Sequence, residues 1–131
     1  MKCSYKIIIV AILMFLANPV NALSNSEVRS QIQRFIDTQQ FPQDMGDELT
    51  IWVGSRTTTR GLLYNYKLKI AQDKLPSISR VFKSIEADSF KNLCTNPAMR
   101  WYKKNDVDII YRYIDKKKNV VSIFKINGSD C

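Results

Sequence analysis

Side chains able to carry out acid–base or nucleophilic chemistry are few in this chain, and histidine is absent from all 131 residues. Histidine is the usual general base and the commonest metal ligand in proteins. A Walker-type phosphate loop and a dinucleotide-binding glycine fingerprint are absent as well. The cysteines left after export are expected to be oxidised, which removes a thiolate nucleophile. We therefore expect no enzyme activity, no cofactor and no metal site.

Carboxylates are the remaining candidates for acid–base work, because glycosidases use a pair of them. Each carboxylate here has a simpler explanation from its position: it precedes a strand or helix, begins a turn or lies on the polar side of a helix. The candidates are Asp47, Glu48, Asp73, Glu86, Asp88, Asp106, Asp108 and Asp115. This pattern favours a binding protein over a catalyst.

A polar segment bracketed by Gly54 and Gly61 is the first candidate binding site. It carries Arg56, Thr57, Thr58, Thr59 and Arg60. Guanidinium and hydroxyl groups in a loop can donate hydrogen bonds to a carboxylate, a phosphate or a sugar. The alternative is a solvated hairpin loop that binds nothing, since such loops are common.

A second candidate surface combines lysines with two aromatic rings. Its members are Trp101, Tyr102, Lys103, Lys104, Lys116, Lys117 and Lys118. Exposed aromatics at a helix end suit a protein interface, and clustered lysines can steer a protein toward an anionic surface. The alternative for the three consecutive lysines is a soluble turn that guards against edge pairing. Period-two alternation along the predicted strands places the tyrosines on one face and most charged side chains on the other. Rings that could stack on bases and charges that could bind phosphates therefore do not lie together, and we expect no nucleic acid partner.

The first 22 residues have the pattern of a cleavable secretory signal peptide. Lys2 and Lys6 precede an apolar run of 11 residues, and Ala22 ends the segment with a small side chain. A membrane-spanning helix needs roughly 20 residues. We therefore expect cleavage after Ala22, a periplasmic or secreted protein, and no transmembrane segment in the mature chain. The alternative is an uncleaved N-terminal anchor.

Export also determines what the three cysteines can do. Cleavage would discard Cys3 and leave Cys94 and Cys131, and two cysteines in an oxidising compartment most simply form a disulfide. Such a bridge would stabilise the fold by about 3–4 kcal/mol on the chain-entropy model. A free thiol or an intermolecular bridge is the alternative. Cleavage would also remove two lysines, lowering the net charge from +8 to +6.

Residues 23–131 have the length of a single small domain. Helical spacing of apolar residues predicts a helix that begins at Ser24 and ends near Phe41, and a second helix that begins near Ile78 and ends near Cys94. A further helical turn should begin at Pro97. Period-two alternation predicts strands over residues 49–53, 62–70, 107–114 and 120–126, with Asn119 able to adopt positive φ in the last turn.

The order of these elements predicts an α+β fold, α-β-β-α-β-β. Hairpin connections favour antiparallel pairing, and alternating strands favour one covered sheet face. We therefore expect a four-stranded antiparallel sheet with two helices on one face and one disulfide. The cysteine, strand and turn pattern over residues 90–97, 109–115 and 123–131 resembles small exported proteins of Gram-negative bacteria, and the resemblance implies a scaffold and a location only.

Taken together, these features predict a non-catalytic exported envelope protein that acts through protein–protein binding. The simplest such role is an accessory of a secretion, pilus or conjugation assembly, with another envelope or secreted protein as partner. One alternative is a periplasmic inhibitor or immunity protein that neutralises a toxin or cell-wall hydrolase through a protruding loop, for which residues 54–61 are the candidate. A second alternative is a secreted basic effector.

Overall fold

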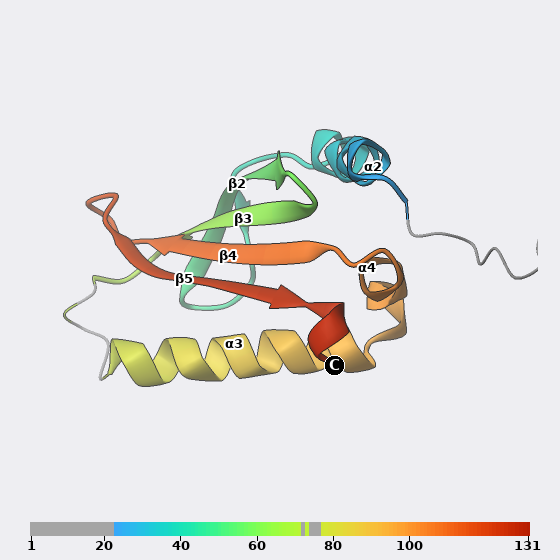
Figure 1. The fold of residues 1–131 in the computed structure, drawn as a ribbon. Coiled ribbons are helices and arrows are strands. Elements are labelled where there is room, and N and C mark those ends of the chain that lie inside the picture. Colours follow the sequence, from blue (N-terminus) through green and yellow to red (C-terminus); the bar gives the residue numbers. More distant parts are fainter. Residues whose placement is uncertain (1–22, 72, 74–76) are drawn as a thin grey trace, which may run out of the picture.

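The structure is a computed structural model that describes residues 23–71, 73 and 77–131. The predicted signal peptide, residues 1–22, lies outside the described residues. Within them, five strands form one mixed sheet in the order β1-β2-β3-β4-β5, accompanied by three α-helices (Figure 1). The α+β class is therefore confirmed, whereas the four-stranded antiparallel sheet and the two helices are not.

The first described helix, α2 (Asn25–Asp37), begins where the capping pattern predicts. The Ser24 hydroxyl oxygen accepts the Glu27 backbone N–H at 3.3 Å, and the hydroxyl donates to the Glu27 carboxylate at 2.9 Å. Such contacts satisfy donors that a helix N-terminus leaves unpaired. Val28, Ile32 and Ile36 on its apolar side are buried. The helix ends four residues before Phe41, which forms a cis peptide bond with Pro42.

The strand boundaries differ from the expected ones in two places. The strands are β1 (Gln43–Asp44), β2 (Thr50–Thr58), β3 (Gly61–Leu68), β4 (Asp108–Ile114) and β5 (Val120–Asn127). β1 was not among the predicted strands. β2 continues through the polar segment, and it stays paired with β3 as far as Thr58 and Gly61. The expected polar loop is thus a strand, because β3 supplies backbone partners whether or not the side chains are apolar.

The pairing of β3 with β4 is parallel, which corrects the expectation of an antiparallel sheet. A parallel pair needs a long crossover connection, and α3 (Ile78–Thr95) provides it by carrying the chain back along the sheet. Gly61 is required where the two strands begin, because a Cβ atom there would collide with the backbone carbonyl oxygen of Asp108. Alternation along the sequence contains no information about this direction.

A third helix follows α3, so the predicted further helical turn is present. Pro97–Met99 form a 3-10 turn, and α4 (Arg100–Lys104) continues directly from it. The Asn96 side chain caps the turn by accepting the Ala98 N–H at 3.0 Å. The expectation of two helices was wrong because α4 is only five residues long, too short for apolar side chains to show a helical period.

The predicted disulfide between Cys94 and Cys131 is present, with its Cα atoms 5.6 Å apart. It joins the last turn of α3 to the residue after the 3-10 turn Gly128–Asp130. Gly128 packs directly on Lys103 of α4, where a Cβ would overlap that side chain. The bridge and this contact together hold α3, α4 and the end of β5 in one unit.

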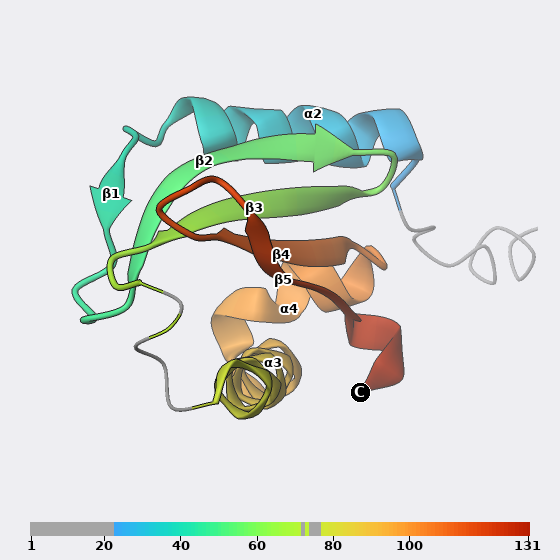
Figure 2. The same ribbon diagram turned by 90° about the vertical axis from the view of Figure 1, so that its left-hand side faces the viewer.

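Both long helices pack on the same face of the sheet, which we call the covered face. Phe35 of α2 stacks on Trp52 with ring centroids 6.2 Å apart, and Phe82 of α3 packs on Tyr113 at 4.8 Å. Figure 1 looks along α2 and shows α3 from the side, whereas Figure 2 shows the reverse, so the two helices cross the sheet in different directions.

Stacked tyrosines fill the space between the two helices. Tyr64 lies 5.3 Å from Tyr111, and Tyr66 lies 5.1 Å from Tyr113, measured between ring centroids. Burial raises the pKa of all four hydroxyl groups, so they remain neutral at physiological pH. The tyrosine face of β3 predicted from alternation is therefore core, with aromatic pairs that each add about 0.5–1.5 kcal/mol beyond burial.

Candidate protein-binding surfaces

Arg60, the last residue of the predicted binding loop, forms hydrogen bonds within the fold. Its guanidinium donates to the Leu23 carbonyl and the Asn25 side chain at 2.9 Å each, and to the Asn105 carbonyl at 2.6 Å. A fourth bond reaches the Asp106 carbonyl at 3.2 Å. The side chain thus links the start of α2 to the end of α4, and four of the five N–H donors of its guanidinium are used in doing so.

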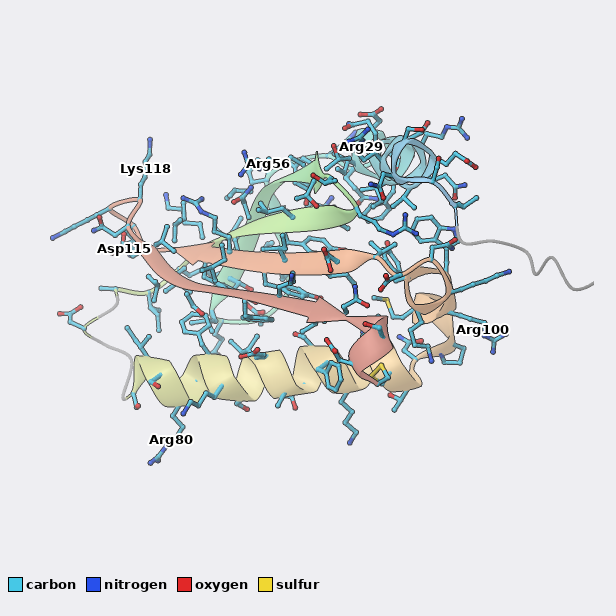
Figure 3. The ribbon with its side chains drawn as sticks, viewed as in Figure 1. Arg29, Arg56, Arg80, Arg100, Asp115 and Lys118 are labelled. Atoms are coloured by element: carbon cyan, nitrogen blue, oxygen red, sulfur yellow. A yellow bond between two sulfur atoms is a disulfide. The ribbon has the colours of Figure 1, made fainter. Side chains whose placement is uncertain are left out.

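The other residues of that segment are not brought together either. Arg56 is paired with Leu63 and Thr57 with Leu62, so the two side chains leave β2 on opposite faces of the sheet. Only Thr59 and Arg60 connect β2 to β3. Figure 3 shows Arg56 on the sheet, well away from Arg100 beside α4. The segment forms no protruding loop.

The second predicted surface is divided between two ends of the molecule. α4 lies at one end of β4, and the hairpin that carries Lys116, Lys117 and Lys118 lies at the other (Figure 1). Lys103 also differs from the expectation, because its ammonium donates to the Cys94 carbonyl at 3.0 Å and is only partly exposed. Lys104 is exposed.

The β4–β5 hairpin owes its shape to one carboxylate. Asp115 accepts the backbone N–H groups of Asn119 at 2.9 Å and Lys117 at 2.8 Å. These bonds, led by that from Asn119, lower the pKa of Asp115 below its ordinary value. Lys118, and not Asn119, adopts the positive φ of 66°. The three lysines are solvent-exposed around this turn.

Trp101 and Tyr102 line a cleft of about 250 Å³ between α4 and α2, which we call the aromatic cleft. Ile32, Phe35 and the exposed Gln31 of α2 form its other wall. The two aromatic rings stand perpendicular, with centroids 5.2 Å apart, and both are half-buried. Burial raises the pKa of Tyr102. A cleft lined in this way accepts an aliphatic or aromatic side chain from a partner.

The geometry of this cleft depends on the arginine network described above. Arg60 bonds to the residues that flank α2 and α4, and the Asn105 amide donates to the Trp101 carbonyl at 2.9 Å. Phe35 in the cleft wall is backed by Trp52 of the core. The cleft is therefore preformed, so a partner need not order it on binding.

Two further properties were searched for in the described part of the chain. No group of three or more cysteine or carboxylate side chains there is arranged to hold a metal ion. None of the helices over residues 23–71 and 77–131 combines the length and the apolar character needed to cross a membrane.

The sequence analysis missed a second surface, on the uncovered face of the sheet. Arg56, Lys67, Arg112 and Lys125 project there from four neighbouring strands, with isoleucine side chains between them. Alternation along β3 does place Lys67 opposite the tyrosines. The sequence alone does not show that the basic residues of four strands share one face, because their alignment depends on the parallel pairing.

Comparison with known proteins identifies the fold and no family. No family model and no curated protein sequence matches the chain. A solved structure from Pseudomonas aeruginosa, provisionally described as a secreted protein, has a TM-score of 0.66 at 13% identity and covers 85% of this chain and 98% of its own. The pilotin EpsS of the Vibrio vulnificus type 2 secretion system has a TM-score of 0.62 at 7% identity, covering 82% and 90%. The fold is thus shared with exported and secretion-associated proteins.

Proposed function

We propose that this protein is a non-catalytic exported accessory of a secretion, pilus or conjugation assembly, and that it holds a partner protein in the aromatic cleft. The observation that carries the proposal is the preformed cleft, in which Trp101 and Tyr102 of α4 face Phe35 and Ile32 of α2. The fold shared with a pilotin and with a protein provisionally described as secreted supports it. Export through residues 1–22, with cleavage after Ala22, is part of the proposal.

The chemistry of the cleft suits a protein partner. Tryptophan and tyrosine dominate the binding energy of many interfaces, because they bury a large area and lose little conformational entropy. At about 250 Å³ the hollow is small, so it accommodates one or two side chains of a partner segment. The remaining contacts would come from exposed α2 residues around the cleft.

The inhibitor or immunity alternative needs a protruding loop to enter a partner's active site. Residues 54–61 were the candidate, and they form the end of β2, a tight turn and the start of β3. Arg60, the residue at its tip, is bonded to backbone carbonyls on both sides. The protruding loop predicted for that alternative is therefore not formed by residues 54–61.

Site-specific photo-crosslinking in the native host tests the proposal. A photoreactive side chain in place of Gln31, at the cleft, should capture a component of an envelope assembly. The matched control is Gln33, which is exposed on α2 but does not line the cleft. Equal capture from both positions would contradict the assignment of the site, and capture of only cytoplasmic proteins would contradict the function.

A substitution at the cleft gives a second measurement. Trp101→Ala should weaken binding of the captured partner about tenfold or more, and Trp101→Phe should retain most of the affinity. Because Trp101 is only half-buried, circular dichroism and thermal unfolding of both variants can confirm that the fold is intact. Unchanged affinity in a folded Trp101→Ala protein would place the partner elsewhere.

A further inference from the structure

The uncovered side of the sheet, which we call the open face, presents a regular array. One row, formed by Thr58, Gly61, Asp108 and Asn127, lies at the margin of this face, and strand pairing aligns the remaining side chains in three central rows across β2, β3, β4 and β5. The rows are Arg56, Leu63, Ile110 and Lys125; Gly54, Asn65, Arg112 and Ile123; and Ile51, Lys67, Ile114 and Val120. Each row therefore alternates or mixes aliphatic with basic or amide side chains.

No described helix packs on this face. None of the residues in its three rows belongs to either of the two core clusters. Ile123 is 58% exposed and Val120 is 51% exposed, which is high for aliphatic side chains. Leu63 is buried although it lies outside both clusters. The long side chains beside it in the row can cover it with their aliphatic parts while their charged groups stay in water. Such an exposed, ordered aliphatic surface is typical of an interaction site.

The charges of the open face are all of one sign across these rows. They carry four basic side chains and no carboxylate. Two carboxylates lie at its margins, outside the central rows: Asp44 forms an ion pair with Lys69 at 2.7 Å, and Asp108 accepts from the uncharged Asn127 amide at 2.9 Å. The field over the centre of the face is therefore positive, and it attracts an anionic partner.

A hollow of about 450 Å³ lies in the middle of this field. The pairing of β2 with β3 shifts register between Trp52 and Gly54, and Gly54 has no side chain to fill the space beside the bulge. The hollow is lined by Val53, Gly54, Arg56, Asn65, Arg112 and Ile114. The bulge and the missing side chain at Gly54 together account for the depression at this point.

The polar groups in the hollow are mainly hydrogen-bond donors. Arg112 donates one guanidinium N–H to the Asn65 carbonyl oxygen at 3.2 Å, which orients the guanidinium and leaves its other N–H groups free for a ligand. Arg56 lines the hollow from β2, whereas Arg112 lines it from β4, and Arg56 is exposed. Two guanidinium groups around one depression match a carboxylate, which each can bind through two parallel hydrogen bonds.

We propose that the open face binds an acidic segment of a partner polypeptide, with a carboxylate seated in the hollow between Arg56 and Arg112. Aliphatic side chains that flank the carboxylate would pack on Ile110, Ile114 and Ile123. A polypeptide explains both the donors and the isoleucines, because acidic and aliphatic side chains alternate readily along an extended segment. This surface is separate from the aromatic cleft, and the proposal does not depend on the function proposed for that cleft.

The occupant is a different protein rather than this chain itself. Residues 1–22 contain no aspartate or glutamate, so the chain's own N-terminal segment cannot supply the carboxylate. Two copies that met through their open faces would bring like charges together, which disfavours a symmetric dimer through this surface.

A fluorescently labelled, capped peptide of alternating glutamate and leucine serves as the probe, with the glutamine and leucine peptide as its neutral counterpart. Fluorescence anisotropy should show binding of the acidic peptide that weakens as salt is raised, and little binding of the neutral one. Amide NMR shifts should concentrate in β2, β3 and β4. Absence of binding at low salt, or equal binding of both peptides, would overturn the proposal.

Two variants locate the site. Arg56→Gln/Arg112→Gln should weaken binding about tenfold or more. Gly54→Val should also weaken it, because its side chain would occupy the hollow; nothing lies within 4 Å of a Cβ at that position, so the fold should tolerate it. The control Arg29→Gln/Arg80→Gln removes the same charge from exposed positions on α2 and α3 (Figure 3), and binding should change by less than about twofold.

An equal loss in the control variant would show that net charge alone attracts the peptide, which would overturn the proposal. Vesicles of phosphatidylglycerol provide the last arm. If the Arg56→Gln/Arg112→Gln variant loses vesicle binding while its peptide binding is unchanged, the face recognises a membrane surface and not a polypeptide.

Discussion

The two faces of the sheet use the same alternation for different purposes. On the covered face, Tyr64, Tyr66, Tyr111 and Tyr113 stack between α2 and α3 and hold the fold together. On the open face, the intervening residues place isoleucines beside arginines and lysines, and none of them belongs to either core cluster, although Leu63 is buried. A strand whose alternate side chains are buried in the core thus has its other side chains free for recognition. The polar residues of an alternating pattern can therefore form a binding surface.

The largest expected difference between the faces is in stability. Trp52→Ala should lower the free energy of unfolding by about 4 kcal/mol, because Trp52 is 6% exposed and contacts Phe35, Phe41 and Tyr64. Ile110→Ala on the open face should cost about 1 kcal/mol, since that side chain is only half-buried. Urea denaturation measures both. Similar losses for the two variants would mean that the open face is covered in solution.

A smaller difference is expected between two arginines of the same polar segment. Arg60→Ala should cost about 2 kcal/mol, because it removes charge-assisted bonds to the Leu23, Asn105 and Asp106 carbonyls. Arg56→Ala should change stability by less than about 0.5 kcal/mol, as is usual for exposed sites. Hydrogen exchange at the start of α2 should rise only in the Arg60 variant. Equal effects would show that both arginines are merely surface residues.

The smallest effect concerns the hairpin at the end of the open face. The folded-state pKa of Asp115 is lowered, so its stabilising contribution is present above the ordinary value of 3.8 and is lost as the pH falls below it. Asp115→Asn should therefore weaken the dependence of stability on pH in this acidic range. Unfolding temperatures measured from pH 2 to 6, about two units on either side of 3.8, test this expectation. Asp88→Asn, at an exposed position on α3, is the matched substitution. An unaltered profile in the Asp115 variant would contradict the assignment.

Local features of the fold were predictable from the sequence. The Ser24 cap, the tyrosine face of β3, the last hairpin and the Cys94–Cys131 bridge each depend on neighbouring residues or on a simple count. The parallel pairing of β3 with β4 was not predictable, because period-two alternation identifies the faces of a strand and not its partners or their direction. The same limit explains why the strand predicted over residues 49–53 ends before β2 does.

The candidate sites show the same division. Arg60 was predicted to bind a ligand, whereas its partners are backbone carbonyls remote in sequence, which no local motif reveals. Trp101 and Tyr102 were predicted to be exposed; they are half-buried and line a cleft, and their role in binding stays a prediction. Their supposed association with the 116–118 lysines failed, because β4 separates the two groups by its full length.

The central parallel pair has a consequence for the order of folding. The β2–β3 and β4–β5 ribbons each close through a short connection, so each can form early as a local hairpin. Joining β3 to β4 requires contacts between distant segments, with α3 in between, and carries the larger loop-closure cost. We expect the rate-limiting step of folding to be the docking of the two preformed hairpins. The aromatic cleft and the open face both depend on the pairing of β3 with β4, so we expect them to form only after that step.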